Sequence, residues 1–483
     1  MMKWVRAGLV AGGLLVAGTT TSAQQAAATT GSPAAGANAS PVRVQVPAAT
    51  RAAIERLIDA GVADTLAYRR VGELVDAYPG RLGGSAALEG AIDWALARMK
   101  ADGLENVHAE SVLVPHWVRG AEAAELAKPR AAGLHMLGLG GSVATPAGGI
   151  TAPVLVVSGK ADLERRAAQA RGKIVLFDAP FVSYGETVQY RSMGAIWAAR
   201  VGAVASLIRT VGPFSIQSPH TGSLRYDTAQ AGAPPKIPGA ALSVEDAMML
   251  HRMQDRGETP VVHLVMSGRT LEPAPSRNVI GELRGSERPE EIVVVSGHLD
   301  SWDVGQGAMD DAGGAVAAWE AVRLMKQLGL RPKRTVRVVL WTNEENGVAG
   351  GRGYAREHAA ELPRHVLAIE SDEGTFRPLG FSFAGEARLL AAMQAVAAPL
   401  ARIGAGKVEA GGGETDIGPM MRQGVPGMGL TVEGSRYFWY HHSAGDTLDK
   451  LDPKEVALCV AALAGMAYGV ADVTEIPAAG TPR

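Results

Sequence analysis

The sequence predicts an α/β protein: a three-layer sandwich around a mostly parallel mixed sheet, with a β-rich module inserted into it. One observation is the alternation of strand and helix patterns from Asn278 onward. Another is the change of texture over 134–275, where short β-like runs are separated by Gly and Pro. The length of 483 residues also exceeds that of one small domain.

Local patterns predict each element of the sandwich. Apolar residues at helical spacing predict helices over 49–79 and 84–103, and the stretch 107–120 alternates like a strand. In the second half, strands are expected at 291–297, 334–342, 365–371 and 427–432, with helices at 311–329, 350–362, 385–404 and 453–472. The sandwich domain is therefore expected over 48–133 and 276–475, the insert over 134–275 and a tail over 476–483.

The N-terminus predicts export. Residues 1–23 combine Lys3 and Arg6, an apolar run and the small residues "TSA", which is the pattern of a secretory signal peptide cleaved after Ala23. A transmembrane anchor is disfavoured because about a dozen apolar residues fall short of the ~20 that span a bilayer. The Ala/Ser/Thr/Gly/Pro-rich residues 24–47 predict a disordered leader. We expect a periplasmic or secreted protein, free of the membrane after cleavage.

Composition narrows the function. The formal net charge is −2, so no basic excess points to nucleic acid or to an anionic membrane. Hydrophobic residues at 47% and charged residues at 20% are typical of a globular protein. The single cysteine, Cys459, excludes an intramolecular disulfide, and its apolar helical surroundings predict a core position.

Imidazoles and carboxylates follow the expected strands, where ligands bind in α/β sheets of this kind. They are His298 and Asp300 in "GHLDSW", Asp310 and Asp311 in "GAMDDAGG", Glu344 and Glu345 in "TNEENG", Asp372 in "ESDEG", and His441, His442 and Asp446 in "YHHSAGDT". Taken singly, each could be a helix cap or a polar loop residue. Together at successive strand ends they predict a site for zinc or a similar transition metal.

These motifs resemble the co-catalytic di-zinc aminopeptidase family, which includes secreted bacterial leucyl aminopeptidases and the carboxypeptidase Q (plasma glutamate carboxypeptidase) branch. The resemblance covers nearly all of the chain after residue 50. The insert resembles a protease-associated domain, which that branch carries ahead of its first zinc ligand, and the ending "YFWYHHSAGDT" is closest to the same branch. The resemblance implies a zinc-dependent exopeptidase that acts on dipeptides or short peptides.

Carried over residue by residue, the family pattern implies two zinc ions and a general acid/base, Glu344. The implied ligands are His298, Asp310 and Asp372 for one ion, and Asp310, Glu345 and His442 for the other. Asp300 would orient the His298 imidazole. His442 fits and His441 does not, because the family's ligand lies four residues before the Asp of the "DT" pair. The family also tends to have a cis peptide after the bridging Asp, here Asp310–Asp311.

The implied chemistry is hydrolysis by a zinc-bridging water. Two zinc ions would lower the pKa of that water from ~15.7 toward ~7, and Glu344 would take its proton and pass it to the departing amine. Asp416 could contact a substrate ammonium or, equally, cap the helix that follows it. The expected partner is a peptide or dipeptide; the sequence does not define side-chain preference or oligomeric state, and a homodimer is allowed.

Several alternatives stay open at this point. The enzyme could be an aminopeptidase on longer peptides. A second zinc exopeptidase family shares the ligand order but inserts a dimerisation domain between its last two ligands, whereas the insert here precedes His298. A non-catalytic binding homologue would lose ligands or the base, and a glutaminyl-cyclase-like acyltransferase would bind one zinc and lack the insert.

Overall fold

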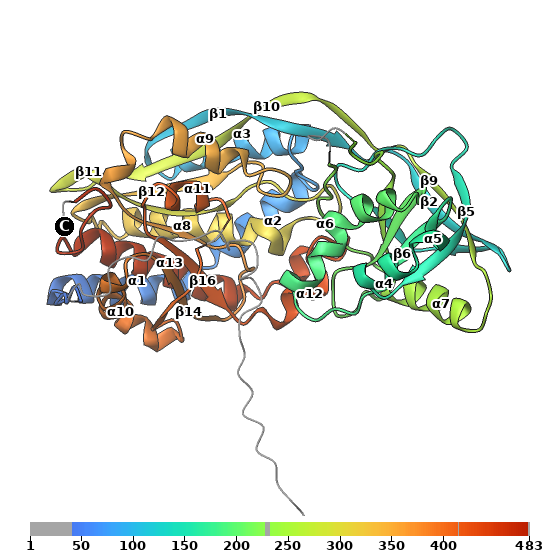
Figure 1. Ribbon diagram of the computed structural model, residues 1–483. Helices are drawn as coiled ribbons and strands as arrows, with labels where there is room; N and C mark the ends of the chain where they lie inside the picture. The colour runs from blue at the N-terminus through green and yellow to red at the C-terminus, as the bar shows by residue number, and fades with distance from the viewer. Residues whose placement is uncertain (1–40, 228–231, 414, 482–483) are drawn as a thin grey trace, which may run out of the picture.

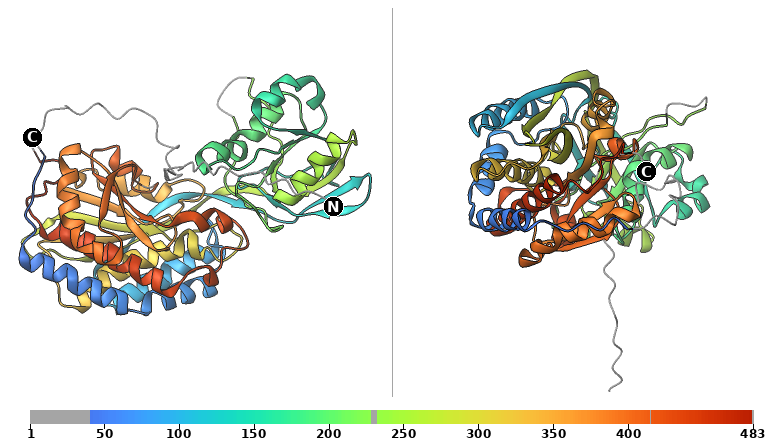
Figure 2. Two further views of the ribbon diagram at one scale, coloured as in Figure 1. Left: turned by 90° about the horizontal axis from the view of Figure 1, so that it is seen from below. Right: turned by 90° about the vertical axis from the view of Figure 1, so that its left-hand side faces the viewer.

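The computed structural model describes residues 41–227, 232–413 and 415–481, so the expected signal peptide lies outside the described residues. The chain forms two lobes, each built on an eight-stranded mixed sheet. Figures 1 and 2 show that the long strands β1 (Glu105–Val118) and β10 (Arg269–Leu283) run side by side from one lobe to the other. The mixed α/β class is as the sequence predicts.

The first sheet carries the four strands expected in the second half of the chain. Its order is β1-β10-β12-β11-β13-β16-β14-β15. The remaining strands are β11 (Arg288–His298), β12 (Arg334–Trp341), β13 (His365–Glu370), β14 (Pro378–Ala384), β15 (Lys407–Ala410) and β16 (Gly427–Val432). The central strands β12, β11, β13 and β16 are parallel, whereas β10 and β14 join them antiparallel. Strands β14 and β15 were not expected from the sequence.

Helices cover both faces of this sheet and give three layers. On one face Val293 and Val295 belong to an apolar core that they share with α1 (Ala48–Ala63), α2 (Leu66–Ala77), α3 (Ala86–Ala101), α8 (Gly313–Gln327), α10 (Leu390–Ala397) and α13 (Pro453–Asp472). On the other face Val294 and Val339 pack against α9 (Ala349–Glu357) and α11 (Gly418–Met421). Alternating valines of β11 therefore serve both cores, as a buried strand requires.

Helix α13 is the central core helix. Asp452 caps it by accepting the Lys454 N–H at 2.7 Å, and Pro453 occupies its first turn, where no N–H is needed. It is long and apolar enough to cross a membrane, but 83% of its most apolar stretch is buried inside the protein. Cys459 is fully buried there and donates to the Phe376 carbonyl at 3.0 Å, which confirms its core position.

Three predicted segments differ from the structure. The helix expected over 385–404 is broken into a 3₁₀ turn at Ala387–Leu389, α10 and a 3₁₀ helix at Ala398–Ile403, because Pro399 lacks an N–H for the helical ladder. Residues 41–47, expected as part of a disordered leader, lie along the sandwich instead: Val42 donates to the Arg388 carbonyl at 2.7 Å and Val46 is buried. The expected tail also packs, with Ile476 fully buried.

The second sheet forms the inserted lobe, in the order β3-β2-β9-β5-β6-β7-β8-β4. Its strands are β2 (Glu122–Lys128), β3 (Ala132–Leu134), β4 (Met136–Gly138), β5 (Ile150–Val157), β6 (Ile174–Phe177), β7 (Ala205–Arg209), β8 (Gly239–Leu242) and β9 (Val261–Met266). Its helices are α4 (Lys160–Arg165), α5 (Ala167–Ala170), α6 (Tyr184–Arg200) and α7 (Val244–Asp255). Separate apolar clusters fill its two faces.

The limits of this sheet do not coincide with the expected insert boundaries at 134 and 275. The sheet begins with β2 at Glu122, and the Pro-containing segment expected as a connector is part of β10. Proline is tolerated at Pro273 and Pro275 because β12 pairs only with residues 279–283 of β10, which leaves one side of the proline stretch unpaired in the sheet.

Candidate metal centre

Parallel strands deliver the predicted side chains to one edge of the first sheet. His298 is the last residue of β11, Glu344 and Glu345 follow β12, and Asp372 follows β13. Because these strands are parallel neighbours, their carboxyl ends meet. Asp310 joins them from the irregular turn Ala308–Ala312 that leads into α8, and the peptide bond between Asp310 and Asp311 is cis, as expected.

Asp310 lies between two groups of ligand-type side chains. The His298 Nε2 is 3.2 Å from Asp310 Oδ1 and 3.2 Å from Asp372 Oδ1. On the other side, His442 Nε2 is 3.2 Å from Asp310 Oδ2 and 3.0 Å from Glu345 Oε2. All five side chains are buried. One carboxylate thus turns each of its oxygens toward a different imidazole–carboxylate pair.

The two adjacent histidines occupy different positions. His442 contacts both Asp310 and Glu345, whereas His441 Nε2 reaches only Asp310 Oδ2, at 3.5 Å. The two rings are stacked with centroids 3.5 Å apart. The backbone of His442 has a φ of 60°, a conformation that is uncommon for non-glycine residues. The geometry favours His442 as the ligand, in agreement with its spacing in the motif.

Asp300 is fully buried and supports the glutamate pair. Its Oδ1 accepts the Glu344 N–H at 3.0 Å and its Oδ2 accepts the Glu345 N–H at 3.3 Å. The sequence led us to expect that this carboxylate orients His298. In the structure the nearest partner of His298 Nδ1 is the backbone carbonyl of Asp300, at 3.0 Å, and the carboxylate is 3.7 Å away.

Two further buried aspartates hold the Asp310 turn, and neither role was derived from the sequence. Asp446 accepts the backbone N–H groups of Ala308, Met309 and Asp310 at 3.1, 2.8 and 3.1 Å. Asp311 accepts the His298 N–H at 3.1 Å and the Gly314 N–H at 3.0 Å, which joins β11 to the start of α8. Asp446 stands in the "YHHSAGDT" motif, but its partners are set by tertiary structure alone.

The electrostatics of the cluster favour a bound positive charge. Burial, and then the charge of Asp372, raises the pKa of Glu344 to about 8. Burial and the charge of Asp310 raise the pKa of Glu345 well above its usual value. For Asp310, burial is outweighed by hydrogen bonds to His298 and His442, which hold its pKa well below the ordinary range. A bound cation would stabilise all these carboxylates in the charged form.

The residues present fit zinc. Buried Glu345 Oε1 has no hydrogen-bond partner among the described residues, and an unpaired buried oxygen of this kind is costly without a ligand. A small space of about 10 Å³, lined by Asp310, Glu345 and His442, lies between them, roughly the volume that one water or small ion needs. Imidazole nitrogen and carboxylate oxygen are the donors that zinc takes.

Comparisons with known proteins agree with this geometry. Peptidase family M28 matches residues 278–467. Carboxypeptidase Q from Mus musculus is 50% identical over 409 residues, which cover 85% of this chain and 86% of that protein. Carboxypeptidase Q from Homo sapiens is 48% identical over 424 residues, covering 88% and 89%.

The chain belongs to peptidase family M28. A solved structure of a peptidase M28 precursor from Shewanella amazonensis SB2B superposes with a TM-score of 0.85 at 35% identity, covering 88% of this chain and 97% of that chain. A zinc aminopeptidase from Bacillus subtilis, at 19% identity and a TM-score of 0.64 over 84% and 97% of the two chains, shares the fold. The expected class, a zinc-dependent exopeptidase, is confirmed.

Asp416 lies on the same side of the first sheet as the candidate metal ligands. Its carboxylate is buried and unpaired. Neither of its oxygens has a hydrogen-bond partner among the described residues. Burial, followed by the charges of Glu370 and Glu344, raises its pKa well above the usual value. The alternative role as a helix cap is wrong, because Ile417 occupies the cap of α11 and no side-chain oxygen accepts its N–H groups.

The insert of this M28 peptidase contacts the backbone of two candidate metal ligands, which the sequence did not indicate. His220 and Ser443 form a β-bridge, and the Thr221 N–H donates to the His442 carbonyl at 2.8 Å. Ser223 Oγ donates to the Glu345 carbonyl at 3.1 Å. The segment 220–223 therefore holds the backbone of both residues that flank Asp310 Oδ2.

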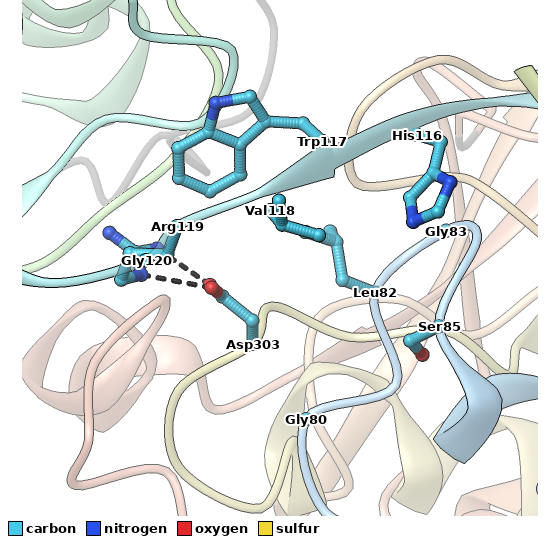
Figure 3. A pocket seen from close by; sticks show the side chains of 10 residues that line it. All are labelled: Gly80, Leu82, Gly83, Ser85, His116, Trp117, Val118, Arg119, Gly120 and Asp303. Atoms are coloured by element: carbon cyan, nitrogen blue, oxygen red, sulfur yellow. Dashed lines mark hydrogen bonds and ion pairs between the residues drawn. The ribbon is translucent and has the colours of Figure 1, made fainter. Parts of the chain in front are cut away.

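A larger cavity of about 270 Å³ lies where the two lobes join (Figure 3). It is lined by Gly80, Leu82, Gly83, Ser85, His116, Trp117, Val118, Arg119, Gly120 and Asp303. Arg119 donates from Nε and Nη2 to Asp303 at 2.9 and 2.6 Å, as Figure 3 shows. None of the candidate metal ligands lines this cavity, so the chemistry is assigned to the smaller space.

Proposed function

We propose that this enzyme hydrolyses dipeptides or short peptides at a terminus with two zinc ions per chain. The observation that carries the proposal is Asp310, whose two oxygens face two separate imidazole–carboxylate pairs. One ion would be held by His298, Asp310 and Asp372, and the other by Asp310, Glu345 and His442. A single ion would leave one pair of buried charged groups without a partner, which is costly.

Glu344 is the proposed general acid/base. Zinc, when bound, lowers the pKa of a water and polarises a carbonyl. Glu344 is half-buried and makes none of the contacts that join the five ligands, so its carboxylate is free to take a proton from water. It would then deliver the proton to the departing amine nitrogen.

The proposal also gives a role to Asp416 and considers the oligomeric state. The unpaired carboxylate of Asp416 would accept a substrate ammonium group, if that group is buried at this site. A homodimer is compatible with this proposal. The relatives near 50% identity are carboxypeptidase Q. This similarity supports substrates that present a free C-terminus.

Export and the identity of the insert complete the proposal. The first 23 residues support secretion to a periplasm or beyond, with cleavage after Ala23. The position of the insert ahead of His298, and its β-rich sheet packed with helices, support a protease-associated type of domain.

A panel of dipeptides tests the function. Unblocked, N-blocked and C-blocked versions of one dipeptide are assayed before and after metal removal with a chelator, and again after zinc is restored. We expect cleavage of the unblocked dipeptide, its loss with the chelator and its return with zinc. Activity that survives complete metal removal would exclude the mechanism. Cleavage confined to N-blocked substrates would exclude both an aminopeptidase and an enzyme that acts on free dipeptides.

A further inference from the structure

A buried arginine lies behind the loop that joins two of the candidate metal ligands. Arg81, which stands between α2 and α3, is fully buried. The loop covers residues 299–307 and runs from His298, at the end of β11, to the turn that carries Asp310. Because this loop connects the two ligands, its shape fixes where the His298 imidazole and the Asp310 carboxylate lie relative to each other.

The Arg81 guanidinium holds both ends of this loop. Its Nε donates to the Leu299 carbonyl at 2.7 Å, directly after the ligand His298. At the other end, its Nη1 donates to the Gln306 carbonyl at 2.8 Å and its Nη2 to the Gly307 carbonyl at 2.9 Å. A guanidinium is planar and carries its five N–H groups in a rigid fork. One rigid group therefore joins the two ends of the loop.

The backbone of Arg81 adds two contacts to the middle of the same loop. The Arg81 N–H donates to Ser301 Oγ at 3.1 Å, and the Arg81 carbonyl accepts the Ser301 N–H at 3.2 Å. Packing leaves no spare room beside these contacts. A Cβ at Gly307 would lie 2.3 Å from the Ser301 Cβ and 3.1 Å from the Arg81 Nη2, and Gly307 has a φ of 57°. The loop and the arginine therefore fit each other closely.

The charge of Arg81 also belongs to the metal centre. Arg81 forms no ion pair with a carboxylate of the described residues, whereas the equally buried Arg334 pairs with Glu291. Burial lowers the pKa of Arg81 to about 10, and the negative charges of Asp446 and Asp300 oppose this effect. An uncompensated buried charge is unfavourable. The carboxylates that compensate Arg81 are thus those that support the loops of the candidate ligands.

We propose that Arg81 is a positioning residue of the metal centre, which holds His298 and Asp310 at the separation that lets both bind one ion. This inference rests on the proposed metal centre. Arg81 contacts neither ligand side chain and acts through the backbone of residues 299–307. Groups that orient metal ligands from outside typically change metal affinity about 10–100-fold when they are replaced. The same size of effect is expected here.

The test measures zinc affinity of the full chain by competition with a chromophoric chelator, for Arg81→Met and Arg81→Lys. The matched control is Arg334→Met. Like Arg81, Arg334 is fully buried and donates to four backbone carbonyls. It stands at the start of β12, however, at the opposite edge of the sheet from the candidate ligands. Circular dichroism checks that each variant is folded, and urea denaturation measures the stability of the metal-free protein.

A positioning role predicts a loss of zinc affinity that the control does not share. We expect Arg81→Met to lower zinc affinity about 10–100-fold. Arg81→Lys should lower it less, because an ammonium keeps the charge and can still donate to carbonyls. Arg334→Met should change zinc affinity by less than about threefold, since distant sites act independently. Both methionine variants should lower the stability of the metal-free protein, so stability alone does not separate them.

Other results would overturn the inference. Unchanged zinc affinity in Arg81→Met, with a loss of stability like that of the control, would make Arg81 a core residue only. A gain in zinc affinity would show that Arg81 acts by repelling the metal charge and not by positioning. If Arg81→Met does not fold, the comparison of Arg81→Lys with Arg334→Lys decides in the same way. A wild-type enzyme that binds no zinc would contradict the proposed metal centre itself, which separates the two failures.

Discussion

The carboxylate of Asp300 accepts the backbone N–H of Glu344 at 3.0 Å, and this bond fixes the loop that carries the proposed base. Its second oxygen accepts the next N–H along the chain, that of Glu345. Two adjacent backbone groups are thereby held by one side chain. The neighbouring glutamates can then diverge, with Glu345 turned to His442 and Glu344 left outside the ligand contacts.

Asp300→Asn should weaken metal binding. Asparagine keeps one acceptor oxygen but places an NH₂ group against the second backbone N–H, so the glutamate loop loses part of its support. We expect zinc affinity to fall about 10–100-fold, as for other residues that support metal ligands. Competition with a chromophoric chelator measures it, with Asp303→Asn as the control outside the ligand set. Wild-type zinc affinity in Asp300→Asn would contradict this role.

Asp446→Asn should destabilise the fold as well as the site. The Asp446 carboxylate accepts three backbone N–H groups of the Asp310 turn, and one asparagine oxygen cannot replace both carboxylate oxygens. We expect a loss of about 1–3 kcal/mol in the free energy of unfolding, measured by urea denaturation of the metal-free protein. Asp449→Asn, at an exposed ion pair, should change it by less than ~1 kcal/mol. Equal effects would argue against the assignment.

His358 should make stability depend on pH. Burial lowers its pKa, but hydrogen bonds to Glu110 and Glu361 outweigh burial and raise the pKa from 6.5 to about 9. The protonated form is therefore stabilised: the contribution is full below pH 6.5 and is lost as pH rises through about 9. His358→Gln should cost about 1–3 kcal/mol more of the free energy of unfolding at pH 6 than at pH 9.5.

Glu110, in the same network, should make stability fall at low pH. Burial raises the pKa of Glu110, but hydrogen bonds to His108 and His358 outweigh it and lower the pKa from 4.5 to about 2, so its contribution is present above pH 4.5 and is lost as pH falls through about 2. The His358–Glu110 pair should be strongest between pH 4.5 and 6.5. A Glu110→Gln, His358→Gln double-mutant cycle in that window tests it, and additive costs would show that the pair is uncoupled.

Sequence patterns predicted what is local and periodic. Valine-rich runs such as 293–295 make buried strands, and the order of strands and helices implies a parallel centre whose ends bring His298 and Glu345 together. The inferences about strands need only the chain direction and the side-chain period. The preference for His442 over His441 came instead from the motif spacing of the family that the chain resembles.

What the sequence did not indicate depends on long-range contacts. Arg191 contacts His442 although the two residues are 251 positions apart in the sequence. Thr221 and Ser223 each hold a ligand loop through one hydrogen bond, and a single bond produces no periodic pattern in the sequence. Asp300 stands next to His298 in the motif, yet its carboxylate serves the glutamates on the next strand. Strand β15 is only four residues long and pairs only with β14, so its pattern is weak.

The most direct test of the account measures zinc per chain and dipeptide turnover together in Glu344→Gln and Glu345→Ala. Glu344 is assigned to proton transfer and Glu345 to the second metal, although they are neighbours of the same residue type. We predict that Glu344→Gln keeps two zinc ions and loses turnover by about 10²–10⁴-fold, whereas Glu345→Ala loses the second ion. Equal metal loss in both variants, or full turnover in Glu344→Gln, would contradict the central claim.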